Sequence, residues 1–383
     1  MSQKLRALIS VQDITHPDKL VGLEKTAYDY VIKTHKGKNT DKGRLTRRVN
    51  TIYKFLIQTN QNAIDSSSLI VTPTNGDTGV TTVPIDSRQY ILTGTPMYKI
   101  IRNEHLIFDA HLSSGVPLLL VGPKGTGKTL AIANWASKKK LCLIQYDCSE
   151  GTKEANLVGR FTMSKKNDTP YKLGVIPTII ECANQQGTAV LVLEEMNALT
   201  PAMQKQLNPL LDWRKGMFVE PVGKYYRLNK DAKLLIFATM NPSSYGASTN
   251  ELNEDLMSRF AIWQWGYAST SDEKKILDTQ GLDKNFIRNI LNLAKESRAM
   301  HRKNEISYPI STRDLDLLVH QFKAYKNVKG IDALQTALEV IVLGKYDVEE
   351  EKAQMKSRIE SIFGVTDDSK QFKAVPKTEE ESV

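Results

Sequence analysis

The stretch LLLVGPKGTGKTLAIANW, residues 118–135, decides the fold of this chain. An apolar run typical of a buried strand leads directly into a glycine-rich turn, and a run of helix-forming residues follows. The turn fits the pattern G-x-x-x-x-G-K-[ST], whose glycines let successive backbone N–H groups point inward at phosphate oxygens. A strand, this turn and a helix in that order predict an α/β domain with a phosphate-binding loop.

We expect the turn and the start of its helix to hold the phosphates of a nucleotide. Lys128 would supply a positive charge to the β- and γ-phosphates, and the Thr129 hydroxyl can coordinate Mg²⁺. A glycine-rich turn with a chance lysine would explain the pattern but not the strand and helix around it. The predicted cofactor-binding residues are Gly122, Pro123, Lys124, Gly125, Thr126, Gly127, Lys128, Thr129 and Leu130.

Apolar runs alternate with helical stretches between residues 90 and 268. The clearest are LCLIQYD (141–147), AVLVLEE (189–195) and AKLLIFATMN (232–241). Short strands that are separated by helices predict a mostly parallel sheet covered by helices on both faces. The carboxyl ends of such strands line one crevice, where ligands bind.

Two of these runs end in polar side chains that we expect in that crevice. Glu194 is predicted to lie near Mg²⁺, and Glu195 to orient and deprotonate the attacking water. Asn241 follows the next strand, where its uncharged amide can hold that water or a phosphate oxygen. Taken singly, a solvated strand end and an Asn-Pro turn are the plain alternatives.

Two arginines beyond the predicted sheet are further candidates. Arg259, in LNEDLMSRF (252–260), is either a surface residue or a finger that reaches a neighbouring subunit's nucleotide and neutralises charge in the transition state. In ISTRDL (310–315), Ser311 and Asp314 fit a capping box. The box places Arg313 in the first turn of a helix, from which it can reach the nucleotide.

The basic character of the chain belongs to its first residues. The net charge is +9, and residues 1–58 carry 12 Lys and Arg against 5 Asp and Glu, an excess of seven. The cluster KTHKGKNTDKGRLTRR (33–48) could contact nucleic acid or another acidic surface, but the sequence favours a solvated basic face.

Cysteines and apolar runs predict a cytoplasmic protein that does not enter a membrane. Cys142, Cys148 and Cys182 are odd in number and lack metal-ligand spacing, which favours free thiols in a reducing compartment. No apolar run reaches transmembrane length, and the first residues lack the apolar stretch of a secretory signal.

Composition divides the chain into five predicted parts. A basic, mainly helical segment spans 1–58, and a linker rich in Ser, Thr, Asn, Gly and Pro spans 59–89. The α/β nucleotide-binding domain spans 90–268. Apolar residues at helix spacing, such as Ile287, Ile290, Leu291 and Ala294, predict an all-α domain over 269–363. A polar tail, 364–383, is predicted to be disordered.

In the order of its motifs, the chain resembles the AAA+ ATPases of the MoxR type, in the branch that includes midasin and dynein-related modules. It is similar above all to the Q-type chaperones that activate Rubisco or nitric-oxide reductase, and to the gas-vesicle ATPase. The resemblance covers residues 90–345 and is carried by five segments: SGVPLLLVGPKGTGKT (114–129), ANLVGRF (155–161), LGVIPTIIECANQQGTAVLVLEEMNAL (173–199), LNPLLDWRKGMFVEPVGKYYRLNKDAKLLIFATMNPSSYG (207–246) and ISTRDL (310–315).

The resemblance implies a role for each candidate residue in a P-loop AAA+ domain with a helical lid. Gly122–Thr129 would be Walker A and Glu194–Glu195 Walker B, although the family usually has Asp at the first Walker B position. Asn241 would be sensor 1, Arg313 sensor 2 and Arg259 the arginine finger, with Arg214 as a rival trans-acting arginine.

The family also implies a ring, usually of six identical subunits, with ATP and Mg²⁺ at each boundary. Such rings remodel or assemble partner proteins, often with a von Willebrand factor A domain protein. The stretches GRFTMSKKNDTPYKLG (159–174) and VEPVGKYYRL (219–228) are then either client-contacting loops or ordinary hairpins.

Two other functions fit the same core. One is a nucleic-acid motor or helper that binds DNA or RNA through residues 1–58. The other is a scaffold that assembles on nucleotide and hydrolyses it weakly, because Glu194 replaces the usual Asp.

Overall fold

The computed structural model describes residues 80–163, 169–242 and 251–364. The predicted N-terminal segment, most of the predicted linker and all of the predicted disordered tail except Gly364 lie outside these ranges. The chain divides into two compact units, Met1–Thr74 and Asn75–Val383, and every described residue belongs to the second. Within the described ranges, none of the helices combines the length and apolarity needed to span a membrane.

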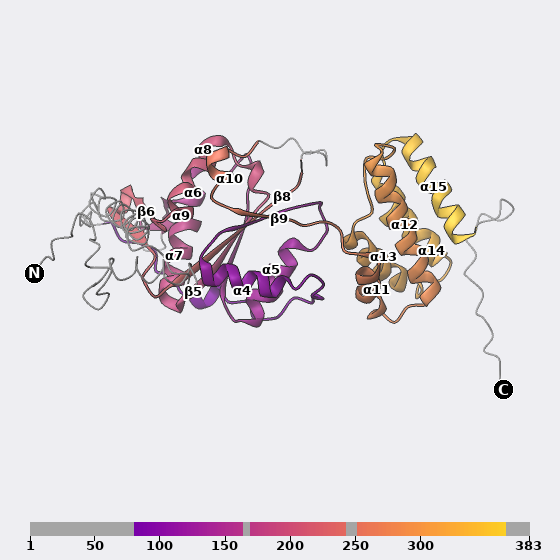
Figure 1. Ribbon diagram of the computed structural model, residues 1–383, viewed down its shortest axis with the longest axis horizontal. Helices are drawn as coiled ribbons and strands as arrows, with labels where there is room; N and C mark the ends of the chain where they lie inside the picture. Colours follow the sequence, from indigo (N-terminus) through magenta and orange to yellow (C-terminus); the bar gives the residue numbers. More distant parts are fainter. Residues whose placement is uncertain (1–79, 164–168, 243–250, 365–383) are drawn as a thin grey trace, which may run out of the picture. The chain divides into compact units, whose positions relative to one another are not determined.

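A five-stranded parallel sheet forms the centre of the α/β domain (Figure 1). All neighbouring strands run parallel, which confirms the predicted sheet. The order across the sheet is β2 (Cys142–Asp147), β5 (Thr188–Glu194), β8 (Lys233–Met240), β1 (Leu118–Val121) and β9 (Ala261–Gln264). Because β5, β8 and β1 are neighbours, the residues that follow them meet at one edge of the sheet.

Helices cover both faces of this sheet (Figure 1). Side chains alternate along each strand, so Leu118 and Leu120 pack on one face and Leu119 on the other. The first face is covered by α4 (Glu104–Ser114) and α5 (Lys128–Lys138), the second by α7 (Val175–Gln186). Burial on both faces explains why the strands are continuously apolar.

Short elements connect the layers of the α/β domain. Two of them are antiparallel hairpins, which the sequence marks as candidate contact loops: β3 (Gly159–Phe161) with β4 (Tyr171–Leu173), and β6 (Gly216–Val219) with β7 (Lys224–Arg227). Residues 164–168 of the first loop lie outside the described ranges. The remaining elements are η2 (Ser87–Tyr90), α6 (Glu154–Leu157), η3 (Met196–Ala198), α8 (Pro201–Gln206), α9 (Asn208–Leu211), η4 (Glu220–Val222) and α10 (Glu254–Met257).

The described end of the predicted linker packs on the α/β domain. Tyr171 exchanges backbone hydrogen bonds with this segment, donating to Thr81 and accepting from Val83 at 2.8 and 3.0 Å. Ser87 is buried, and its backbone carbonyl accepts from the Cys142 thiol. The segment from residue 80 onward therefore contributes contacts to this domain.

A helical bundle follows the sheet and has its own apolar core. It comprises α11 (Thr270–Asp278), α12 (Lys284–Arg302), α13 (Thr312–Tyr325), α14 (Ala333–Ile341), η6 (Leu343–Lys345) and α15 (Glu349–Phe363). The predicted stripe on α12, from Ile287 to Ala294, is buried in this core, which confirms its helical assignment. Arg298 on α12 pairs with the buried Glu273 on α11 at 2.8 and 2.9 Å, and this pair also ties the bundle together.

Candidate nucleotide-binding site

The phosphate loop connects β1 to α5, as the sequence predicts. Gly125 and Gly127 have φ of 71° and 83°, a left-handed conformation that glycine adopts without strain. Gly122 has a different constraint, because a Cβ there would stand 1.8 Å from the Trp265 carbonyl oxygen. The Thr126 hydroxyl closes the loop by donating to the Pro123 carbonyl at 2.9 Å. Glycine is therefore required at three points of this loop.

Two neighbouring segments hold the loop from outside. The Trp265 indole N–H donates to the Thr126 carbonyl at 3.1 Å, and the Arg313 backbone N–H donates to the Gly125 carbonyl at 3.1 Å. Arg313 lies in the first turn of α13, where Ser311 and Asp314 form the predicted capping box. The start of α13 therefore lies against the phosphate loop.

Lys128 is buried at the centre of the loop. Its amine donates to the carbonyls of Gly122 and Pro123 at 2.7 and 2.8 Å, and to Asn241 Oδ1 at 3.4 Å. Burial lowers the pKa of Lys128 to about 8, while the charge of Glu195 acts in the opposite direction. An anion bound in the loop would restore the charged amine, so the group is suited to phosphate.

The two predicted metal ligands contact each other. The Thr129 hydroxyl donates to Glu194 Oε2 at 2.7 Å, which joins the first turn of α5 to the end of β5. Among the described residues there is no group of three or more His, Cys, Asp or Glu that could hold a metal. Mg²⁺ needs no such group when it binds through phosphates, water and one carboxylate, and a hydroxyl beside a carboxylate fits that requirement.

Glu195 directly follows β5 with φ of 50°, a strained conformation for a residue with a side chain. Its backbone N–H donates to the Thr239 hydroxyl at 3.2 Å. Asn241 Nδ2 donates to Glu195 Oε1 at 3.3 Å, and Lys124 Nζ lies 3.6 Å from the same oxygen. The crevice is the place where the phosphate loop, Glu194, Glu195 and Asn241 meet. The Glu195 carboxylate is half exposed there, in the position that a base that activates water would need.

Asn241 connects the two sides of the crevice. Its Oδ1 accepts from Lys128, and its Nδ2 donates to Glu195. The structure thus brings together the predicted loop, both glutamates, Asn241 and Arg313, whose catalytic roles stay predictions. Leu130, the last predicted loop residue, lies on the exposed side of α5.

The two candidate trans-acting arginines lie elsewhere and close to each other. Arg214 and Arg259 both contact Asp212. Within the described ranges, neither guanidinium forms a hydrogen bond or ion pair with the phosphate loop, the glutamates or Asn241. The crevice of one chain therefore lacks these two cations.

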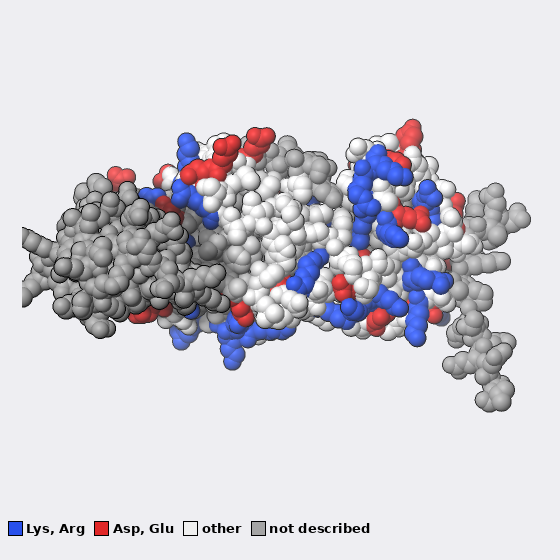
Figure 2. Space-filling model, in the orientation of Figure 1, with Lys and Arg blue, Asp and Glu red and all other residues white. Residues whose placement is uncertain are grey.

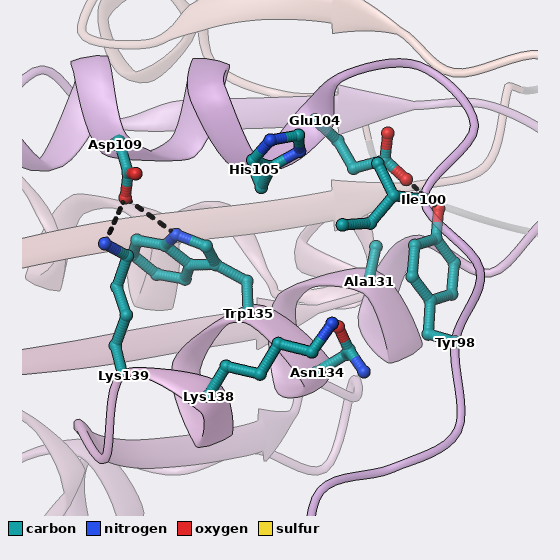
Figure 3. A pocket seen from close by; sticks show the side chains of 10 residues that line it. All are labelled: Tyr98, Ile100, Glu104, His105, Asp109, Ala131, Asn134, Trp135, Lys138 and Lys139. Atoms are coloured by element: carbon teal, nitrogen blue, oxygen red, sulfur yellow. Dashed lines mark hydrogen bonds and ion pairs between the residues drawn. The ribbon is translucent and has the colours of Figure 1, made fainter.

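A cavity of about 270 Å³ lies between α4 and α5 (Figure 3). Its carboxylates already have partners: Glu104 accepts from the backbone of Arg102 at 2.7 Å, and Asp109 from Trp135 and Lys139 at 2.9 Å each. None of the residues predicted for the site lines it. We therefore assign the crevice, and not this cavity, to the chemistry.

Several contributing residues were not predicted from the sequence. Trp265 and Thr239 support the site through contacts between segments distant in the sequence, which no local pattern reveals. Asp212 had a weak local signal, because an Asp side chain often accepts a hydrogen bond from the backbone N–H two residues on. Its contact with Arg259 could not be read from that pattern.

Comparison with known proteins agrees with this geometry. Residues 117–260 match the AAA domain of the dynein-related subfamily. The chain is 26% identical over 226 residues to protein CbbQ of Hydrogenophilus thermoluteolus, covering 59% of this chain and 81% of the relative. It is 24% identical to protein NorQ of Paracoccus denitrificans over 70% of this chain and 94% of the relative. It is also 24% identical to the denitrification regulatory protein NirQ of Stutzerimonas stutzeri over 57% of this chain and 76% of the relative.

A parallel sheet with a phosphate loop and two acids at the same edge defines a P-loop nucleotide-binding protein. The domain match shows that residues 117–260 form an AAA domain, and the relatives show that the chain is similar to AAA+ ATPases of the MoxR type.

Proposed function

We propose that this protein is a Mg²⁺-dependent ATPase that assembles into a ring, of six copies as in its family, and remodels or assembles a partner protein. The observation that carries this proposal is the Asn241 amide, which joins the Lys128 amine to the Glu195 carboxylate at 3.4 and 3.3 Å. This contact supports the proposal because it joins the residue proposed to bind phosphate to the residue proposed as the base.

Each residue of the crevice has a distinct task in this proposal. Lys128 and the loop N–H groups bind the β- and γ-phosphates of ATP. Thr129 and Glu194 would hold Mg²⁺, which when bound neutralises charge on the phosphate oxygens. Glu195 accepts the proton of the attacking water, and Asn241 orients that carboxylate.

A second copy of the chain would complete this site. Arg259 would reach the neighbouring subunit's ATP, with Arg214 beside it, because neither arginine bonds to the crevice of its own chain. Such a contact joins two different surfaces, and a heterologous contact that closes makes a ring. Arg313 would contact the nucleotide of its own subunit, because its backbone already binds the phosphate loop.

The relatives suggest the kind of task but not the client. NirQ is named a denitrification regulatory protein. We infer that this chain likewise acts on another protein, with a von Willebrand factor A domain protein as one candidate partner. The three cysteines are free and buried, which supports action in a reducing cytoplasm.

Capture of the client tests this proposal most usefully. The Glu195→Gln chain keeps its binding loop and should bind ATP without turning it over, so that it holds its client. Recovery of the same partner with this variant and ATP, but not with Lys128→Ala, is the expected result. Hydrolysis at the unchanged rate by Glu195→Gln would remove the assigned base.

Nucleic-acid association is a second candidate function with an observation of its own. A groove between α11 and α12 is lined by four cations and no acid: Lys274, Lys284, Arg288 and Lys295. Within the described ranges these side chains form no ion pair. Figure 2 shows Lys and Arg side chains gathered over the helices of the bundle. A groove of this charge attracts phosphate backbones.

Salt-dependent binding separates this candidate from the first. If the groove binds nucleic acid, Arg288→Glu should weaken binding of a single-stranded oligonucleotide and reduce its salt dependence. Arg302→Glu, on the same helix and outside the groove, is the matched control. Binding that is lost on deleting residues 1–58 but kept in Arg288→Glu would assign it to the N-terminal segment instead.

A further inference from the structure

Asp212 organises the turn that carries Arg214. Asp212 Oδ1 accepts from the Arg214 backbone N–H at 2.9 Å, and this contact closes an Asx turn. The same carboxylate binds the Arg214 guanidinium, with Nε at 3.1 and 2.9 Å from its two oxygens and Nη2 at 2.5 Å from Oδ2. The carboxylate therefore fixes both the backbone and the side chain of Arg214.

The same carboxylate also reaches Arg259, which comes from a different part of the sequence. Arg259 Nη1 lies 3.6 Å from Asp212 Oδ2, and its Nη2 donates to the exposed Asp255 at 2.9 Å. Asn208 on α9 binds Asp255 at 2.8 Å, which ties the two segments together. Asp212 is thus the residue shared by both arginines.

The Asp212 carboxylate lies between two positive charges, and its negative charge stabilises both of them. Two guanidinium groups repel each other, and an anion that contacts both offsets this repulsion. The Asp212 side chain is only 11% exposed, so water replaces it poorly. If the Asp212 carboxylate is removed from this poorly solvated group, the charges of Arg214 and Arg259 lose the anion that they share. Without Asp212, the two arginines should lose their common orientation.

A second Asp-x-Arg turn in the chain provides a natural comparison. Asp86 accepts from the Arg88 backbone N–H at 3.1 Å and from its guanidinium at 2.9 and 3.0 Å, the same local pattern. There, however, the carboxylate is 40% exposed and, within the described ranges, pairs with no second arginine. Burial and the second arginine, not the turn itself, distinguish Asp212.

We propose that Asp212 is a positioning residue that holds Arg214 and Arg259 as one pair, presented to the nucleotide of a second copy of this chain. This inference rests on the proposed function, since it assumes that the arginines act in trans. In this proposal Asp212 acts only through the two arginines that it binds. The exposed Asp255 is the partner that a phosphate can replace at Arg259, whereas Asp212 keeps its place.

The test compares Asp212→Asn with Asp86→Asn, the same substitution in the two turns. We expect Asp212→Asn to lower ATP turnover about ten- to a hundredfold, because displacement of a positioned group by about 1 Å can have that effect. Its affinity for a fluorescent ATP analogue should stay within about twofold, since its own crevice is intact. Asp86→Asn should leave both values unchanged.

Mixed assemblies separate positioning from a folding defect. The Asp212→Asn subunit has an intact crevice, and the Lys128→Ala subunit has intact arginines, so mixing them should restore turnover above the sum of the two. Asp212→Glu keeps the charge and should retain more turnover than Asp212→Asn. If Asp212→Asn does not fold, the Asp212→Glu variant is measured alone, by its turnover and by its structure. Wild-type turnover in a structure whose two arginines are displaced would overturn the inference.

Other outcomes also overturn the inference and leave the proposed function standing. One is wild-type turnover in Asp212→Asn while Arg259→Ala is inactive. Another is a folded, nucleotide-binding Asp212→Asn chain that mixing does not rescue, which would mean that Asp212 acts within its own subunit. Absence of turnover in the wild type, by contrast, would defeat the proposed function itself.

Discussion

The crevice and the arginine pair differ in what surrounds their charges. In the crevice, Lys128 is buried against its own loop, and this burial lowers the pKa of its amine. In the pair, Arg214 and Arg259 are held by Asp212 and share no hydrogen bond or ion pair with the crevice. The crevice has a buried cation that suits a bound anion, whereas the two arginines are already paired with carboxylates of their own chain. This difference is what we expect if one chain carries two complementary halves of a site, as we propose.

The largest effect should come from the arginine half. Arg259→Ala should lower ATP turnover about a thousandfold, the scale of removing an arginine finger, because charge on the transferred phosphoryl group is no longer neutralised. Affinity for ATP should change little. Steady-state kinetics and analogue binding measure both. Arg302 is an exposed arginine on α12, and Arg302→Ala is the control. An equal loss of turnover in Arg302→Ala would mean that the effect of Arg259→Ala is not specific to the arginine pair.

Lys128→Ala should lose turnover because it loses nucleotide binding, whereas Arg259→Ala keeps binding. Loss of the buried amine should weaken nucleotide affinity roughly a hundredfold, because hydrogen bonds to a charged group are among the stronger ones. Isothermal titration with ATP and Mg²⁺ measures this change, and Lys138→Ala on the same helix serves as control. Unchanged affinity in Lys128→Ala would mean that the loop is not the phosphate site.

The lowered pKa of Lys128 sharpens the comparison through pH. Below about pH 8 the amine is already charged, so nucleotide affinity should be flat. Above that value the amine must take up a proton on binding, and affinity should fall by up to about tenfold per pH unit. The dependence should vanish in Lys128→Ala. A flat profile for the wild type between pH 7 and 9.5 would contradict the assigned burial effect.

Glu194→Asp should have the smallest effect. The carboxylate moves by one methylene and keeps its charge, and Glu194 already reaches the Thr129 hydroxyl at 2.7 Å. Turnover should change by less than about threefold, or under about 0.7 kcal/mol in the barrier. A large rise in turnover would instead support the weakly hydrolysing scaffold. Titration with Mg²⁺ at saturating ATP is the measurement.

The sequence predicted the elements that depend on local chemistry. The loop glycines, the apolar strands and the Ser311–Asp314 capping box each have a pattern within a few residues, and the structure contains all of them. The same patterns placed both glutamates and Asn241 at one edge of the sheet, because parallel strands end there together.

Contacts between distant segments could not be predicted in this way. The sequence treated Arg214 and Arg259 as rivals, whereas the structure joins them through Asp212. Nothing local indicates that Trp265 closes over Gly122, or that Glu195 adopts a left-handed conformation supported by Thr239. These features arise from tertiary packing between segments that lie far apart in the sequence, which local patterns do not reveal.

Mixing two inactive variants tests most directly whether the halves meet between subunits. Arg259→Ala keeps the crevice and loses the finger, while Lys128→Ala keeps the finger and loses the crevice. Turnover of the mixture should rise well above the sum of the separate proteins, with a maximum near equal amounts. Turnover equal to that sum at every ratio, from chains shown to assemble together, would contradict a site completed by a second copy.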